Sequence, residues 1–205
     1  RKKYNSYEDE VNLQKKTGSI YQNKKRINAV QQATKNNVNV AILDDGFQDF
    51  SIKKNFSVVC FNEKQWIGNG FLIPSGPLRE SLNSLRRCNY VFINGYKNLK
   101  IEEIINKFNA KAKIFYTRYK LVNLNNLKSK KILAFAGIGN PNNFFDLLKN
   151  NNLKIIKSIN FPDHYNFSKK DILKLNQEAK ELDAELITTE KDYFRLKNED
   201  KKNIN

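Results

Sequence analysis

Residues 24–46 read KKRINAVQQATKNNVNVAILDDG and predict a helix, a strand and an acidic turn in direct succession. Ile27, Val30 and Ala33 recur at helical spacing, so the first part of this stretch is expected to form an amphipathic helix. The apolar run at 38–43 predicts a short buried strand that stops at the acidic residues. A helix, a strand and a polar turn in this order are typical of a parallel α/β sheet.

The same alternation continues on both sides of a polar stretch that lacks helical periodicity. Before that stretch, strands are expected at 56–61, 90–94 and 113–117, and helices at 78–87 and 101–108. After it, strands are expected at 132–136, 153–159 and 185–189, and helices at 142–149 and from Lys169, with Ser168 as the cap. The sequence therefore predicts an α/β fold with one domain over 1–117, a linker over 118–130 and a smaller α/β domain over 131–205.

Composition limits the classes of protein to which the chain can belong. Hydrophobic residues make up 40% and aromatic residues 12% of the 205 residues, which is typical of a globular protein. No apolar run is long enough to span a bilayer. Cys60 and Cys88 have no metal-binding spacing, so both are expected to be buried thiols of a reducing cytosol.

The formal net charge is +16, which suits nucleic acid, an anionic membrane surface or a phosphorylated substrate. Heavy use of Lys and Asn throughout the chain explains the same charge without any partner. No basic block with interleaved aromatic residues indicates a nucleic-acid surface, so no nucleic acid is expected as a partner.

Asp44 and Asp45 are the first candidate site. They end a predicted strand, and ligands of open α/β sheets bind outside the carboxyl ends of strands. An apolar strand that ends in Asp also presents a carboxylate to Mg²⁺ in many nucleotide-binding enzymes. Asp-Asp-Gly is equally a good turn sequence, so a structural role stays open.

The loop at 68–80 is the second candidate site. Its glycines permit close backbone approach, and Arg79 and Glu80 follow at the start of a predicted helix, where an anion such as a phosphate is favoured. The alternative is a structural Ω-loop in which Arg79 and Glu80 pair with each other.

Two further residues carry possible acid–base chemistry. His164, the only histidine, falls in a loop between a predicted strand and a predicted helix, and imidazole can exchange a proton near neutral pH. A lone histidine is nonetheless more often structural than catalytic. Asp9, within Glu8-Asp9-Glu10, is by its local sequence only part of an acidic surface turn.

Together these segments resemble the signatures of the tetraacyldisaccharide 4'-kinase family. The matching segments, in the family's order, are LDDGFQ (43–48), GNG (68–70), PSGPLRE (74–80), LRR (85–87), FAGIGNP (135–141), FPDH (161–164) and TTEKD (188–192). Each segment alone is a weak match, whereas their common order and compatible spacing are specific. The resemblance extends from about Asp9 to Asp192.

The resemblance implies a P-loop NTPase-like α/β domain joined to a smaller α/β domain. It also implies transfer of the γ-phosphate of ATP to the 4'-hydroxyl of an acylated glucosamine disaccharide 1-phosphate, the lipid A precursor. The implied cofactors are ATP and Mg²⁺, and the implied location is the cytoplasmic face of the bacterial inner membrane, with the membrane surface as a partner.

Roles of single residues follow from the same resemblance. Asp44 and Asp45 would bind the metal, and Gln48 would lie near the cofactor. Arg79 and Glu80 would line the substrate side. Asp9 and His164 would form a catalytic pair, in which Asp9 takes the proton of the sugar hydroxyl.

The chain departs from the family pattern at several places. Glu8 stands where the family usually has Gly, and Asp49 stands where many members have His. No G-x-x-x-x-G-K-[ST] occurs in residues 1–205, and the sequence contains no Met. We therefore expect the P-loop segment to lie upstream of Arg1 and the 205-residue chain by itself to be inactive, because the phosphates of ATP would lack their main ligands.

The alternative function is a non-catalytic, basic α/β protein that binds an anionic glycolipid or RNA. An RNA-binding protein would show affinity that falls steeply with salt, whereas a kinase would select the acylated disaccharide.

Overall fold

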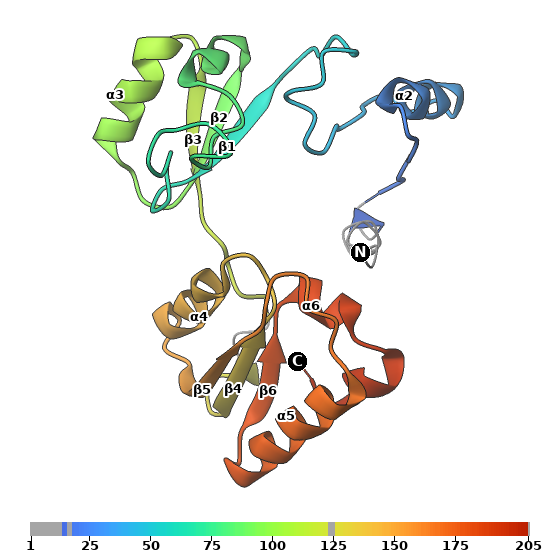
Figure 1. Cartoon of the computed structure of the whole chain (residues 1–205), viewed down its shortest axis with the longest axis vertical. Coiled ribbons are helices and arrows are strands. Elements are labelled where there is room, and N and C mark those ends of the chain that lie inside the picture. Colours follow the sequence, from blue (N-terminus) through green and yellow to red (C-terminus); the bar gives the residue numbers. More distant parts are fainter. Residues whose placement is uncertain (1–13, 16–17, 123–125, 205) are drawn as a thin grey trace. The chain divides into compact units, whose positions relative to one another are not determined.

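Parallel strands form two separate three-stranded sheets in the computed structural model, which describes residues 14–15, 18–122 and 126–204 (Figure 1). The chain divides into two compact units, one formed by Tyr21–Tyr119 and the other built mainly from Lys120–Asn205. The division falls within the segment 118–130. The domain bounds expected from the sequence stay predictions.

The sheet of the first unit has the order β1-β2-β3, with strands β1 (Val58–Asn62), β2 (Tyr90–Asn94) and β3 (Lys113–Thr117). Helix α3 (Leu99–Phe108) covers one face of this sheet (Figure 1). Its Ile101 and Ile105 are buried against the inward side chains of β2, because every second residue of a strand faces the same side.

The opposite face of this sheet carries aromatic side chains in a row. Cys60, Phe92 and Phe115 are register partners on the three strands, and the rings of Phe92 and Phe115 stack with centroids 5.3 Å apart. Cys60 is exposed, and Phe115 is 43% exposed. We call the surface formed by Val58, Cys60, Tyr90, Phe92 and Phe115 the aromatic face. The expectation that Cys60 is buried is wrong, because its side chain lies on this face; Cys88 is buried as expected.

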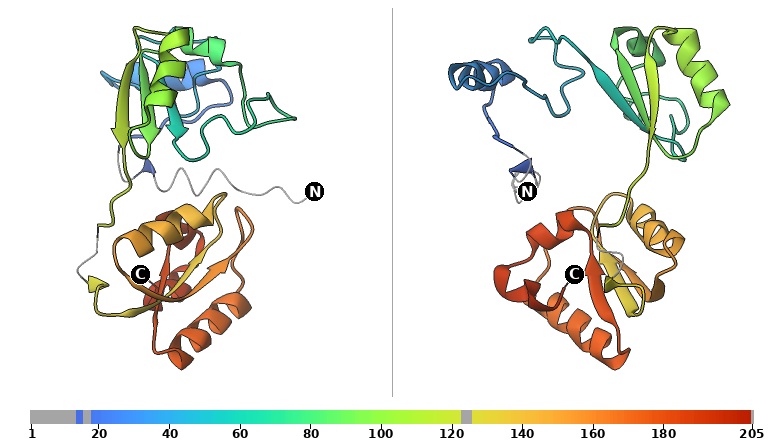
Figure 2. Two further views of the ribbon diagram at one scale, coloured as in Figure 1. Left: turned by 90° about the vertical axis from the view of Figure 1, so that its left-hand side faces the viewer. Right: turned by 180° about the vertical axis from the view of Figure 1, so that it is seen from behind.

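The sheet of the second unit is buried on both faces. Its order is β5-β4-β6, with strands β4 (Lys131–Ala136), β5 (Lys154–Asn160) and β6 (Glu185–Thr188). Helices α4 (Pro141–Asn150) and α5 (Lys169–Glu181) pack on opposite faces (Figure 2). Residues 132–136 of the central strand are all fully buried, alternating between the two cores.

Capping residues fix the ends of the helices in this unit. The Ser168 hydroxyl and the Asp171 carboxylate form a reciprocal capping box at the start of α5, as the sequence predicts. Two short elements follow β6, namely α6 (Glu190–Arg195) and the 3₁₀ helix η3 (Asn198–Asn203). Neither is predicted by the sequence patterns.

Two predicted secondary-structure elements of the first unit are wrong. Helix α2 (Arg26–Lys35) forms as expected, but residues 38–43 are not a strand, and the Ile42 side chain is 91% exposed. A strand needs a neighbour that receives its backbone hydrogen bonds, and no described strand pairs with this run. The expected helix at 78–87 is the shorter 3₁₀ helix η1 (Leu82–Arg87), since an apolar spacing of three residues also fits a 3₁₀ turn.

Over the residues that the structure describes, none of the helices has the length and apolar character that crossing a membrane requires.

Candidate functional site

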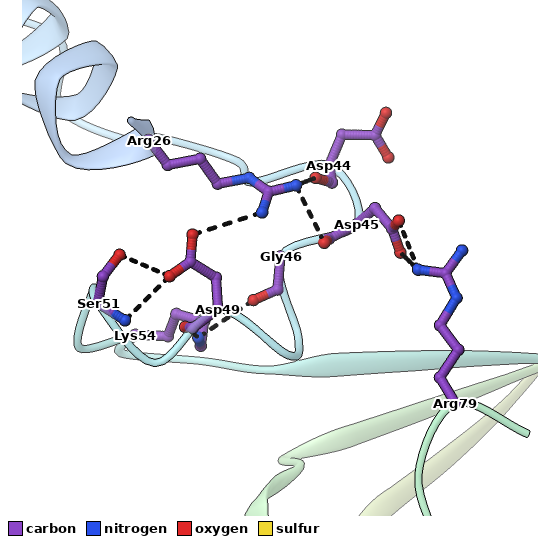
Figure 3. Close-up of polar contacts among 8 residues, drawn as sticks. All are labelled: Arg26, Asp44, Asp45, Gly46, Asp49, Ser51, Lys54 and Arg79. Atoms are coloured by element: carbon purple, nitrogen blue, oxygen red, sulfur yellow. Dashed lines mark hydrogen bonds and ion pairs between the residues drawn. The ribbon is translucent and has the colours of Figure 1, made fainter. Parts of the chain in front are cut away.

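The acidic turn is held by an arginine from α2. The Nη2 of Arg26 donates hydrogen bonds to the backbone carbonyl oxygens of Asp44 and Asp45, each over 3.1 Å (Figure 3). Asp45 has a positive φ of 50°, which Asp tolerates better than most residues. A Cβ on Gly46 would lie 2.6 Å from the Cβ of Leu43, so only glycine fits there. The turn is therefore tightly shaped although no strand leads into it.

Asp45 and Arg79 form a close ion pair that joins two of the sequence signatures. The Nη1 of Arg79 lies 2.6 Å from Oδ1 and 2.5 Å from Oδ2 of Asp45 (Figure 3). The hydrogen bond from Arg79 lowers the pKa of the Asp45 carboxyl. Both side chains are more than half exposed, so the pair contributes less than about 1 kcal/mol to stability. The pair positions charge and adds little to the stability of the fold.

The Asp44 carboxylate points away from the Arg26 guanidinium (Figure 3). Gln48 is half-buried in the segment that follows the turn. Two neighbouring carboxylates offer the hard oxygen ligands that Mg²⁺ prefers, which it usually completes with water and phosphate oxygens. The donor set of Asp44 and Asp45 thus fits Mg²⁺, although Asp45 would have to release Arg79 to bind it. Among the described residues, no cluster of three or more His, Cys, Asp or Glu side chains could hold a metal ion.

Asp49 and Lys54 hold the segment after the turn through contacts that the sequence does not predict. The Oδ1 of Asp49 accepts hydrogen bonds from the backbone nitrogen of Ser51 at 2.9 Å and from its hydroxyl at 2.5 Å. The hydroxyl contact is the main cause of a lowered pKa for Asp49. The Nζ of Lys54 donates to the carbonyl oxygens of Gly46 and Asp49. These contacts give Asp49 a structural role in this segment.

Glu80 pairs with Arg87 and not with Arg79. The Nη2 of Arg87 lies 2.5 Å from Oε2 of Glu80, and its guanidinium stacks over the rings of Phe47 and Phe50 at 4.7 and 4.9 Å from their centroids. The alternative of a structural loop in which Arg79 pairs with Glu80 is therefore wrong in its pairing. Glu80 is instead tied through Arg87 to the segment beside the acidic turn.

The glycines of the 68–80 loop allow the loop to pack against itself. A Cβ on Gly76 would lie 2.2 Å from Oδ1 of Asn69 and 2.4 Å from the carbonyl oxygen of Phe71, so the loop crosses itself there. The Nδ2 of Asn69 donates to the carbonyl oxygen of Ser75 over 2.8 Å. The loop is thus held together by its own contacts, and it places Arg79 beside Asp45. The loop therefore has a structural role and also positions a candidate site residue.

In the second unit, the half-exposed His164 side chain contacts a buried ion pair. The Nη2 of Arg195 lies 3.1 Å from Nδ1 of His164, and Nη1 of the same guanidinium lies 2.8 Å from Oδ1 of Asp192. The side chains of Arg195 and Asp192 are only 2% and 0% exposed. The backbone of Gly137 donates to Asp192 and accepts from Arg195. Breaking this buried pair by removing one partner would cost about 3–5 kcal/mol.

The network lies at the carboxyl ends of all three strands of its sheet. Gly137 follows β4, His164 lies in the loop after β5, and Asp192 follows β6. A Cβ on Gly137 would lie 3.3 Å from Oδ1 of Asp192. The absence of a side chain at Gly137 therefore allows α6 to lie close to the loop after β4. No sequence motif singles out Arg195. Its one signal is a charge three residues after Asp192 in a helix, which is common on protein surfaces.

Asp9 lies outside the described residues. Of the other predicted site residues, the structure brings Asp45 together with Arg79, and Glu80 together with the segment that contains Gln48. His164 belongs to the other unit. Their catalytic and binding roles stay predictions.

These features define a class of protein, namely a two-unit α/β protein with parallel sheets. Its candidate site residues lie in the acidic turn of the first unit and at the carboxyl ends of the strands of the second. The model of the tetraacyldisaccharide-1-P 4'-kinase (LpxK) family matches residues 5–205, and the chain belongs to this family. The resemblance found in the sequence is thus confirmed.

Relatives in this family are longer than the chain. It is 44% identical over 207 residues to the tetraacyldisaccharide 4'-kinase of Pelagibacter ubique (strain HTCC1062), covering 100% of this chain and 66% of that protein. It is 39% identical over 159 residues to the tetraacyldisaccharide 4'-kinase of Rickettsia akari (strain Hartford), covering 77% of this chain and 48% of that protein. The chain thus spans between about half and two thirds of the length of these curated relatives.

A solved structure shares the fold. The crystal structure of the "apo" form of LpxK from Aquifex aeolicus in complex with ATP matches with a TM-score of 0.59 and 24% sequence identity, over 86% of this chain and 54% of that chain. The predicted α/β class with parallel sheets is confirmed by this match.

Proposed function

We propose that this chain provides the metal-binding and acceptor-binding parts of a kinase that phosphorylates the 4'-hydroxyl of tetraacyldisaccharide 1-phosphate in lipid A biosynthesis. The observation that carries the proposal is the contact of Asp45 with Arg79, because it joins the family's DDGFQ and PLRE signatures across 34 residues. Membership of the family and the ATP bound in the Aquifex aeolicus relative support ATP as the phosphoryl donor.

In the proposed reaction, the 4'-oxygen forms a bond to the γ-phosphorus of ATP, the bond between that phosphorus and ADP breaks, and the hydroxyl proton passes to the Asp9 carboxylate. Mg²⁺, when bound, would neutralise charge on the transferred phosphoryl group. Asp44 and Asp45 would hold it through their carboxylates, with Gln48 close to the nucleotide.

Arg79 then has a second partner available to it. While Asp45 is paired with Arg79, both of its carboxylate oxygens contact the same Nη1. A metal on Asp45 would free the guanidinium, whose planar donors suit a phosphate. We propose that Arg79 moves from Asp45 to a phosphate of the substrate, while Glu80, held by Arg87, lines the same side.

The proposed location is the cytoplasmic face of the bacterial inner membrane. The acylated acceptor is a membrane lipid, and a net charge of +16 favours approach to an anionic surface.

The test is phosphoryl transfer from [γ-³²P]ATP to tetraacyldisaccharide 1-phosphate by the full-length protein that the gene encodes. Asp45→Asn is expected to lower kcat by at least about 100-fold, because charge stabilisation in the transition state acts on this scale. Arg79→Lys keeps the charge but loses the planar donors, so a higher KM for the disaccharide is expected, with a smaller effect on the KM for ATP.

Asp183→Asn is the matched control, since the Asp183 side chain is 92% exposed and pairs with Lys131 at the surface of the other unit. Wild-type turnover in the Asp45→Asn protein would refute the proposed role of the acidic turn. Absence of lipid phosphorylation by the wild-type protein would refute the proposed function as a whole.

A further inference from the structure

His164 contacts a side chain that can only donate hydrogen bonds. The Nη2 of Arg195 lies 3.1 Å from Nδ1 of His164. A guanidinium has five N–H donors and no acceptor, so Nδ1 must offer its lone pair in this contact. A neutral imidazole has one protonated and one unprotonated nitrogen. The ring proton of neutral His164 therefore lies on Nε2.

The guanidinium is itself fixed in place, so the contact is not an accident of a mobile surface side chain. Its Nη1 donates to Oδ1 of Asp192 and to the carbonyl oxygen of Gly137, each over 2.8 Å. Oδ2 of Asp192 accepts from the Thr189 hydroxyl at 2.7 Å and from the backbone nitrogen of Gly137 at 3.0 Å. The Arg195 side chain is 2% exposed.

The backbone of His164 is held by the same loop. Its nitrogen donates to the carbonyl oxygen of Gly137 over 3.0 Å, and its φ is 57°, in the left-handed region. The Nε2 atom lies 3.9 Å from Oδ2 of Asp163, too far for a direct hydrogen bond. The His164 side chain as a whole is 32% exposed.

From these contacts we propose that Arg195 is a positioning residue that holds neutral His164 in the Nε2–H form. In this form neither ring nitrogen has a free lone pair, because Nδ1 is occupied by Arg195 and Nε2 carries hydrogen. His164 then acts as a hydrogen-bond donor and does not take up the substrate proton. The second part of this inference rests on the proposed function, whereas the tautomer itself does not.

The single histidine makes the tautomer directly measurable in the 205-residue chain. Long-range ¹H–¹⁵N correlation at pH 8 distinguishes the two forms, because Nε2 is bonded to both ring carbons that carry hydrogen and Nδ1 to only one. The expected spectrum shows Nε2 protonated and a coupling across the hydrogen bond between Nη2 of Arg195 and Nδ1. A protonated Nδ1, or a mixture of tautomers, in the wild-type chain would overturn the proposal.

Variants test whether Arg195 is the cause. Arg195→Met is expected to give averaged shifts from both tautomers, and Arg195→Lys, which keeps a donor, is expected to shift them back toward the wild-type pattern. Lys197→Met, at an exposed position two residues away, serves as the control and should leave the ring signals unchanged. A folded Arg195→Met chain with the wild-type pattern would refute the role of Arg195. If that variant does not fold, the coupling in the wild-type chain decides.

A kinase assay separates this inference from the proposed function. In the full-length protein, Arg195→Met is expected to lower kcat at least about 10-fold with little change in KM, as for loss of an interaction made only in the transition state. Near-normal turnover of a His164→Ala protein would refute a catalytic role for His164. A spectrum of the wild-type chain with Nε2 protonated would still support the positioning role of Arg195.

Discussion

The two sheets of the molecule share strand number and direction but differ in how their faces are covered. In the second unit, α4 and α5 enclose β4, and residues 132–136 of that strand are fully buried. In the first unit, α3 covers one face and the aromatic face stays exposed, with Phe115 at 43%. Parallel sheets are normally covered on both sides. The difference teaches that the second unit has a complete core of its own, whereas the stability of the first depends on a single buried face.

The largest expected effect comes from the doubly covered sheet. Phe135 is fully buried in β4 and contacts Phe161 and Phe167 edge to face. Phe135→Ala is expected to lower the free energy of unfolding of the second unit by about 4 kcal/mol, through lost burial and a cavity. Urea unfolding followed by far-UV circular dichroism measures this loss.

Trp66, the only tryptophan, provides the matched observation in the first unit, where it packs against the core. Its fluorescence transition is expected to stay at the same urea concentration in the Phe135→Ala chain. An equal shift of the Trp66 transition would show that the two sheets unfold together, and the comparison between them would fail.

An intermediate effect is expected at the capping box of α5. Hydrogen bonds from Ser168 lower the pKa of Asp171, so the ionised form is favoured in the folded chain. Asp171→Asn is expected to cost about 1 kcal/mol at pH 7, the usual contribution of a helix cap. Urea unfolding of the two chains at pH 7 gives the difference.

The sign of the pH dependence follows from the lowered pKa. The contribution of ionised Asp171 is fully present above the unfolded-state pKa of about 4 and is lost as the pH falls through the folded-state value. The gap between wild type and Asp171→Asn should therefore close in acid. A gap that persists at the lowest pH would mean that the carboxylate charge is not its cause. Asp183→Asn, at an exposed site, should show almost no gap at any pH.

The smallest effect is expected on the aromatic face. Phe115→Thr keeps a residue that suits a strand and removes a half-exposed ring, so a loss below about 1 kcal/mol is expected in the Trp66 transition. Binding of an apolar fluorescent dye should fall at the same time. A loss as large as that of Phe135→Ala would indicate that the aromatic face is covered in solution.

Sequence patterns predict the strands of both sheets, and the one expected strand that does not form lies outside either sheet. The KILAFA run of β4 has no alternation and forms the expected strand, which the structure shows to be buried on both faces. The VNVAIL run at 38–43 looks similar but forms no strand, because strand formation depends on a partner that apolarity does not specify. An apolar run therefore indicates a possible strand, but it does not show whether a neighbouring strand is present to pair with it.

The same limit applies to the candidate sites. His164 and Asp45 stand out in the sequence because a lone histidine in a loop and a charged residue in a turn are candidates for functional sites. Their partners Arg195 and Arg79 are chosen by the fold, over sequence separations of 31 and 34 residues. Arg79 is indicated both by its place at the exit of the 68–80 loop and by its family signature. Arg195 had no such signal, since only the packing of α6 against the loop after β5 brings it to the imidazole.

The positions of the two cysteines give the molecule an internal chemical reporter. Cys60 is exposed on the aromatic face, whereas Cys88 is buried, and burial raises the pKa of its thiol. An alkylating reagent should thus modify Cys60 at the rate of a free thiol and reach Cys88 only when the core opens. Any molecule that covers the aromatic face would slow the first reaction and leave the second unchanged. Alkylation kinetics can therefore distinguish occupancy of this surface from stabilisation of the whole unit.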